Sequence, residues 1–116
     1  MKSKKPNHQL GQFEQLVITV IIALGDENAY GLAIQRMLAE LYGGDKDVNL
    51  GSVYVTLDRL EIKKYVKSWY SDPLPERGGR SRHCYSVTPD GKRALQESIT
   101  LQQRSLALLH QHMTIT

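Results

Sequence analysis

Residues 49–66, NLGSVYVTLDRLEIKKYV, predict an amphipathic helix whose two faces differ in chemistry. On one face Val53, Leu57 and Leu60 follow the spacing of a helical stripe, so we expect this face to pack on a core. Asn49, or Ser52 in its place, can cap the helix. The other face carries hydroxyl groups and cations, from Ser52, Tyr54, Thr56, Arg59 and Lys63. Such side chains suit the phosphates and base edges of the DNA major groove, although an ordinary surface helix has a similar pattern.

The segments after this helix predict a β-hairpin. Residues 66–71 and 83–88 alternate apolar and polar side chains, which is typical of short strands, and a turn-rich loop joins them. Two glycines let the backbone of this loop come close to another surface, and the loop carries three arginines, Arg77, Arg80 and Arg82. We expect them to contact phosphate or the minor groove, although a solvated tip would have the same composition. Helices followed by such a hairpin predict a winged helix-turn-helix domain, an α+β fold that is mostly α.

The basic residues of the chain are concentrated around this helix and hairpin. The net charge of the 116 residues is only +3, but residues 59–93 hold nine Lys or Arg against four Asp or Glu. Such a local excess favours a polyanionic partner, here double-stranded DNA. A single cysteine excludes an internal disulfide, and the longest apolar run, residues 16–24, is too short to span a bilayer. We therefore expect a cytoplasmic protein without a membrane segment.

The segments before this helix predict a basic arm and two further helices. Residues 1–9 hold three lysines, and we expect a disordered arm that either follows the DNA backbone or is simply frayed. Residues 30–41 have helical spacing with Asn28 as the expected cap, and Val48 is expected to pair briefly beside the hairpin. Residues 10–24 are apolar on more than one side, and one stripe is formed by Phe13, Val17 and Ile21. Because so short a chain offers little to cover this stripe, we expect a second subunit to cover it.

The end of the chain predicts a dimerisation helix. Thr88 is the expected cap of a helix over residues 89–116, with Pro89 in its first turn. Its apolar residues repeat about every 3.5 positions, as in a coiled coil, and they are Leu95, Ile99, Leu106, Leu109 and Met113. Residues 10–88 already complete a winged-helix domain, so we expect this seam to pair with a second copy of the chain.

In this order of elements the chain resembles the PadR family of bacterial transcriptional regulators, and in particular its short subfamily. The resemblance covers about residues 13–95, and it rests on Tyr30-Gly31-Leu32, Gly51-Ser52-Val53-Tyr54, Gly79-Arg80-Ser81-Arg82 and Thr88-Pro89-Asp90-Gly91. It implies a winged helix-turn-helix dimer that binds operator DNA and usually represses. From the pairing of two subunits we expect a palindromic operator, and whether a small-molecule effector relieves repression stays open. By the same resemblance Tyr54 is a recognition-helix residue, and Arg80 and Arg82 are wing residues.

The chain departs from the family in two places, the turn after the recognition helix and the hairpin loop, which is long at residues 73–77. Lys64-Tyr65 occupies the position after the recognition helix where a glycine is usual, so the turn into the hairpin is expected to differ. Some short relatives bind flat aromatic compounds through a tryptophan of the last helix, and this chain has no tryptophan there. That mode of ligand binding is therefore not carried over.

Catalysis and metal binding find no support in the sequence. It contains no Gly-rich phosphate loop, no His-Glu-x-x-His motif and no serine elbow, and His83 with Cys84 supplies too few metal ligands. We expect neither enzymatic activity nor a cofactor. The alternative to a DNA-binding regulator is a winged-helix module that binds a protein partner and does not read DNA.

Overall fold

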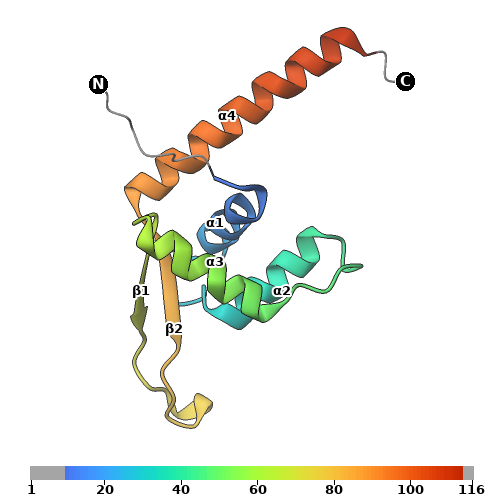
Figure 1. Ribbon diagram of the computed structural model, residues 1–116. Helices are drawn as coiled ribbons and strands as arrows, with labels where there is room; N and C mark the ends of the chain where they lie inside the picture. The colour runs from blue at the N-terminus through green and yellow to red at the C-terminus, as the bar shows by residue number, and fades with distance from the viewer. Residues whose placement is uncertain (1–9, 114–116) are drawn as a thin grey trace.

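The computed structural model describes residues 10–113, with the exception of the side chain of Arg77. Four α-helices, a short 3-10 helix and a two-stranded sheet follow one another as α1 Gln12–Leu24, α2 Gly31–Leu41, α3 Leu50–Ile62, β1 Val66–Tyr70, η1 Pro75–Arg77, β2 His83–Val87 and α4 Pro89–His112. This order confirms the mostly helical winged helix-turn-helix fold (Figure 1). The expected basic arm over residues 1–9 lies outside the described residues, as do residues 114–116.

The expected core stripe of α3 is confirmed. Val53, Leu57 and Leu60 are each 0% exposed. They pack in one cluster with buried residues of α1 and α2, and with Tyr85 of β2. The apolar period of α3 therefore fixes how this helix is rotated about its axis, and with it which side chains face outward.

Two of the three expected helix caps are confirmed. The Asn49 side chain accepts a hydrogen bond from the backbone N–H of Ser52 at 3.0 Å, and the hydroxyl of Thr88 accepts one from the N–H of Gly91 at 3.0 Å. The expected cap at Asn28 is wrong, because its side-chain amide donates to the carbonyl of Leu24 at 3.2 Å and Tyr30 occupies the cap position of α2. Asn28 thus donates a hydrogen bond to the last residue of α1 instead of capping α2.

The turn after α3 has the form that a glycine would give it. Lys64 has a φ of 66°, in the left-handed region. Its N–H donates to the carbonyl of Glu61, and the N–H of Tyr65 donates to the carbonyl of Leu60, each at 2.9 Å. This pair of bonds is the glycine-type ending of a helix. The expectation of a different turn is therefore wrong: the turn is kept, and the side chain of Lys64 adds strain.

Lys64→Gly is expected to stabilise the domain by about 0.5–1 kcal/mol. Removing the Cβ relieves a left-handed conformation that costs about 1–2 kcal/mol, and the greater freedom of glycine in the unfolded chain offsets part of this gain. Urea unfolding measures the difference. Lys64→Ala keeps the Cβ and is the control, so equal midpoints for the two variants would contradict the assignment of strain.

The hairpin is attached to the start of the helix-turn-helix. β1 and β2 are antiparallel, with Val66 opposite Val87 and Tyr70 opposite His83. An additional bridge pairs Tyr30 with Cys84. The expected pairing of Val48 with the hairpin is wrong, because its carbonyl accepts a hydrogen bond from the side-chain amide of Gln35 at 2.7 Å. The third pairing segment thus precedes α2 instead of following it.

Helix α1 is the central helix of the domain, which corrects one expectation. It packs against α2, α3, α4 and β2, and these elements cover it on several sides. Val17 and Ile21 are only 0% and 2% exposed within a single chain, and Phe13 is partly buried against the same core. The expectation that Val17 and Ile21 form a free surface for a second subunit is therefore wrong, because the chain itself covers them. Phe13 is only partly buried, so its contact with a second subunit stays a prediction.

Helix α4 belongs to the domain at its beginning and leaves it further along. Leu95 is buried and Ile99 packs partly against the core, so these two members of the expected seam serve their own chain. The side chain of Gln102 donates to that of Gln15 in α1 at 2.8 Å. From residue 101 to residue 113 every side chain is exposed, and Figure 1 shows this half of α4 extending beyond the other helices. Only the second half of the seam is available to a partner.

Candidate nucleic-acid interface

The outer face of α3 is defined by its buried stripe. At 100° per residue, the positions opposite Val53, Leu57 and Leu60 form an outer line, and its members are Gly51, Val55, Asp58 and Ile62. All four are exposed. Ser52 and Arg59 are exposed along one side of this line, and Tyr54 lies along the other side. This exposed surface, residues 51, 52, 54, 55, 58, 59 and 62, is called the α3 outer face below.

Thr56 does not belong to that face. It is only 5% exposed, so the expectation that its hydroxyl faces the groove is wrong. The reason is its position one residue before Leu57 and three after Val53, which places it on the edge of the buried stripe. The backbone of α3 and its core contacts hold Thr56 inward.

Tyr54 lies across the start of α2. A Cβ added at Gly31 would come within 2.2 Å of the Tyr54 hydroxyl oxygen and 2.5 Å of the ring carbon that carries it. Tyr54 is nonetheless 40% exposed, so one side of the ring packs on Gly31 and the other side remains accessible. This contact explains why the motifs Tyr30-Gly31-Leu32 and Gly51-Ser52-Val53-Tyr54 occur together: the glycine makes room for the tyrosine. Gly31 thereby positions Tyr54 at the edge of the α3 outer face.

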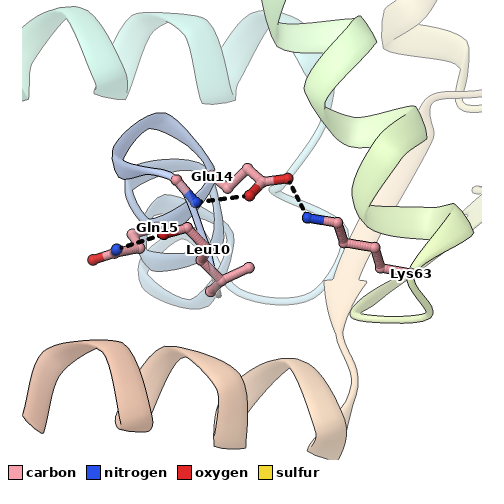
Figure 2. Close-up of polar contacts among 5 residues, drawn as sticks. Leu10, Glu14, Gln15 and Lys63 are labelled. Atoms are coloured by element: carbon pink, nitrogen blue, oxygen red, sulfur yellow. Dashed lines mark hydrogen bonds and ion pairs between the residues drawn. The ribbon is translucent and has the colours of Figure 1, made fainter. Parts of the chain in front are cut away.

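Lys63 is bound to α1, which corrects a further expectation. Its ammonium group contacts Oε2 of Glu14 at 2.9 Å, and the other carboxylate oxygen accepts the N–H of Gly11 at 2.9 Å. Figure 2 shows Glu14 between these two donors. The Glu14 side chain is only 9% exposed. Lys63 therefore neutralises a buried carboxylate and ties α3 to α1, and it does not project from the α3 outer face as expected.

The charge of Glu14 depends on these partners. Burial by itself raises the pKa of Glu14, but the hydrogen bonds from Lys63 and from the Gly11 backbone, with the positive charges of Lys63 and Arg59, outweigh it and lower the pKa below 4.5. A lowered pKa in the folded state means that the carboxylate stabilises the fold above its unfolded pKa. This contribution is lost as the pH falls through the folded value.

Lys63→Met is expected to destabilise the domain by about 1–3 kcal/mol at pH 7, because it leaves the Glu14 carboxylate buried without its cation. Glu14→Gln retains the bond to Gly11 and is the matched comparison. Wild type should lose more stability than Glu14→Gln as the pH falls from 6 to 3. Urea unfolding measures the free energy of unfolding at each pH. If this free energy depended on pH in the same way for the wild type and for Glu14→Gln, the role given to Glu14 would be contradicted.

The wing carries its arginines in different ways. The guanidinium of Arg82 lies over the Tyr30 ring, 4.2 Å from its centroid. The backbone N–H of Arg82 donates to the hydroxyl of Ser71 at 3.0 Å. Arg80 is exposed in the loop. The side chain of Arg77 lies outside the described residues. Arg82 is therefore held against Tyr30, the residue before α2, and Arg80 adds an exposed positive charge in the loop.

Three aromatic rings lie together in the hairpin. His83 lies between Tyr70 and Tyr85, with ring centroids 4.5 Å and 4.8 Å apart. Burial, followed by interactions with Tyr54, Asp58, Glu61 and Tyr70, raises the pKa of Tyr85 to about 12. The contact between Tyr70 and His83 joins β1 and β2 at the end of the strands that leads into the loop.

The structure brings together part of the predicted DNA-binding set. Ser52, Tyr54 and Arg59 share the α3 outer face, while Thr56 and Lys63 face inward or toward α1. Sequence reasoning missed the apolar members of the outer line, Val55 and Ile62, which are 57% and 81% exposed. A helical wheel centred on the buried stripe places both residues opposite the core. They were not predicted as DNA contacts because neither side chain is polar or charged.

Metal-binding clusters and membrane-spanning helices are not found among the described residues. Among residues 10–113 no three His, Cys, Asp or Glu side chains are grouped so that they could hold a metal ion. Over the same residues, none of the helices has both the length and the apolar character needed to cross a bilayer.

Known structures share this architecture. A PadR family transcription regulator from hypervirulent Clostridium difficile R20291 superposes with a TM-score of 0.69 at 25% identity, over 90% of this chain and 100% of that one. A complex structure of hsRosR-S4 is 31% identical, with a TM-score of 0.59 over 83% of this chain and 73% of the other. A PadR-like regulator from Bacillus cereus, 19% identical, shows the same fold with a TM-score of 0.66 over 87% of this chain and 93% of that one.

The amino-acid sequence matches a protein family, although it matches no single curated protein. No curated protein sequence matches the chain significantly. The transcriptional regulator PadR-like family, however, matches residues 20–97, which run from the middle of α1 into the first half of α4. That range contains α2, α3 and the wing, the elements that form the interface described above. The chain therefore belongs to the PadR-like family of DNA-binding transcriptional regulators.

Proposed function

We propose that this protein is a homodimeric repressor that recognises a palindromic operator through α3 and the wing. The α3 outer face carries the proposal, because Ser52 and Arg59 are exposed on it while the opposite face is fully buried. A helix supported in this way can enter the major groove without exposing its core. Membership of a family of transcriptional regulators supports the same function.

The wing supplies a second set of contacts in this proposal. Arg82 rests on Tyr30 at the start of α2, and the bridge between Tyr30 and Cys84 holds the hairpin to the same point. The position of the wing relative to α3 is therefore fixed by α2. We infer that Arg80 and Arg82 contact phosphate or the minor groove beside the groove that α3 enters.

The second half of α4 is the proposed dimerisation element. It presents a broad apolar face, made of Leu101, Leu106, Leu108, Leu109 and Met113, each 45% to 59% exposed. So many exposed apolar residues on one helix mark an interaction surface. Two copies paired through this face would present their α3 helices to successive turns of the major groove, about 34–36 Å apart, and the operator would be a palindrome.

Repression and its relief follow from the same arrangement. A dimer bound at a promoter occupies DNA that the transcription machinery requires. An effector that binds between the subunits would change the distance between the two α3 helices, and the dimer would then no longer match both half-sites. The spacing of the subunits is thus the proposed point of control.

Arg59→Ala is expected to weaken operator binding without unfolding the domain, since Arg59 is exposed. If Arg59 contacts a base, specific binding falls by about 1–3 kcal/mol per half-site while binding to random DNA hardly changes; if it contacts phosphate, both fall together. Titration of both DNAs measures this. Arg104→Ala removes an exposed arginine from the second half of α4 and serves as the control. Unchanged binding by Arg59→Ala would exclude Arg59 from the interface.

The proposed function is tested by selecting bound sequences from a random duplex library with the full-length chain. The expected result is an inverted repeat for which the logarithm of the affinity falls linearly with the logarithm of salt concentration, by a slope of about 0.9 per phosphate contact. A library that shows no enrichment, together with binding that is insensitive to salt, would contradict the proposal and favour a module that binds a protein partner.

A further inference from the structure

The outer line of α3 is not suited to phosphate. Val55, 57% exposed, offers neither a donor nor a charge, and the carboxylate of Asp58 is repelled by phosphate. Ser52 and Arg59, which do suit phosphate or base edges, lie to one side of this line. A single exposed valine is ordinary on a protein surface. Here its place on the line opposite the core gives it a role.

Val55 occupies the part of α3 that comes closest to bases in this kind of domain. In helix-turn-helix proteins the N-terminal residues of the recognition helix reach the base edges. Val55 is in the second turn of α3, and one turn before it stands Gly51, which has no side chain to keep the helix away from the groove. A Cβ at Gly51 would also come within 2.9 Å of the capping oxygen of Asn49. The Asn49 cap and a close approach of α3 to the groove are therefore both favoured by the same small residue, Gly51.

We propose that Val55 contacts the 5-methyl group of a thymine in each operator half-site and so distinguishes thymine from cytosine there. This rests on the proposed function and deepens it. The methyl group of thymine is the one apolar feature of the major-groove edges, and an apolar side chain is its complement. Asp58, the next member of the outer line, keeps this line away from the DNA backbone by charge repulsion, which leaves Val55 over the bases.

Ile62 provides an internal comparison. It lies on the same outer line and is 81% exposed, but it is the last residue of α3. In the major groove the C-terminal end of the helix leaves the bases, so Ile62 should be indifferent to DNA sequence. If the outer line instead docked a protein, the more exposed Ile62 would contribute at least as much as Val55.

The test uses duplexes obtained by selection with the wild-type chain. Each thymine of the selected sequence is replaced in turn by deoxyuridine, which removes only the methyl group. We expect one thymine per half-site at which the wild type loses affinity about fourfold, the factor for burying one methyl group, and about fifteenfold when both half-sites are changed. Val55→Ala, which removes both Cγ methyl groups, should discriminate less between the thymine and uracil duplexes than the wild type does, while Ile62→Ala keeps the wild-type discrimination.

Two results would overturn the inference while leaving the proposed function intact. One is wild-type affinity that is unaffected by every thymine replacement. The other is a Val55→Ala variant that still discriminates as the wild type does. Failure of the proposed function is a different observation, since the selection would then enrich no sequence and there would be no duplex to substitute. Both variants change exposed residues, and circular dichroism confirms that they fold.

Discussion

Leu106→Glu is expected to convert the protein from a dimer into a monomer that still folds and binds its operator about 10²–10⁴-fold more weakly. Leu106 is 54% exposed in the single chain, so a charge there disturbs no core contact. In the proposed dimer it lies in the apolar face of α4, where an unpaired carboxylate would be buried at a cost of several kcal/mol. Once the subunits separate, the two half-sites are bound independently, and the gain from linking them is lost.

Ala107→Glu is the matched control for this variant. Ala107 is also exposed, and it is turned about 100° round the helix from Leu106, away from the apolar face. The same charge placed there should leave both the dimer and the affinity for DNA unchanged. Light scattering gives the mass of each variant. A Leu106→Glu protein that remains a dimer with full affinity would contradict the assignment of this face.

Gly91→Ala is expected to destabilise the domain by about 3 kcal/mol or more, which is opposite in sign to the usual effect. In an exposed helix this change stabilises by about 1 kcal/mol, because alanine is the better helix former. Gly91, in the first turn of α4, is buried, and a Cβ there would lie 2.2 Å from the carbonyl oxygen of Tyr65. That oxygen accepts the N–H of Thr88, so backbone would have to move and the start of α4 would shift.

Urea unfolding of Gly91→Ala beside Gly51→Ala separates the two kinds of glycine. Gly51, in the first turn of α3, is exposed, and the atom that a Cβ would meet is the end of the Asn49 side chain, which can rotate away. Gly51→Ala should therefore be close to neutral, because the loss of the cap, about 1 kcal/mol, is offset by a similar gain in helix propensity. A Gly91→Ala protein as stable as the wild type would show that α4 is not held against the turn after α3.

The sequence predicted those features that depend on neighbouring residues. The spacing of Val53, Leu57 and Leu60 predicted the buried face of α3, and the short-range caps at Asn49 and Thr88 were also predicted. These signals are local, because a helical stripe and a cap are decided within a few positions. The alternating strands and their loop likewise predicted the hairpin.

Several of the errors concern contacts between distant parts of the chain, whereas the wrong expectations for the cap at Asn28 and the turn at Lys64 concern neighbouring residues. Lys63 was assigned to DNA, but its partner Glu14 lies 49 residues away, and no local pattern connects them. Val17 and Ile21 were assigned to a second subunit, because the sequence does not show that α4 and β2 fold back over α1. Thr56 was placed outward because it is polar, whereas the rotation of α3 places it inside.

Two copies of this chain are expected to bind one palindromic DNA through α3 and the wing. Sedimentation of the wild-type protein with its selected duplex, at several salt concentrations, tests this most directly. We expect two chains per duplex and a logarithm of the affinity that falls linearly with the logarithm of salt concentration. The slope should be smaller for the Arg80→Ala, Arg82→Ala double variant. A complex of one chain per duplex, or an affinity that is independent of salt, would contradict this mode of binding.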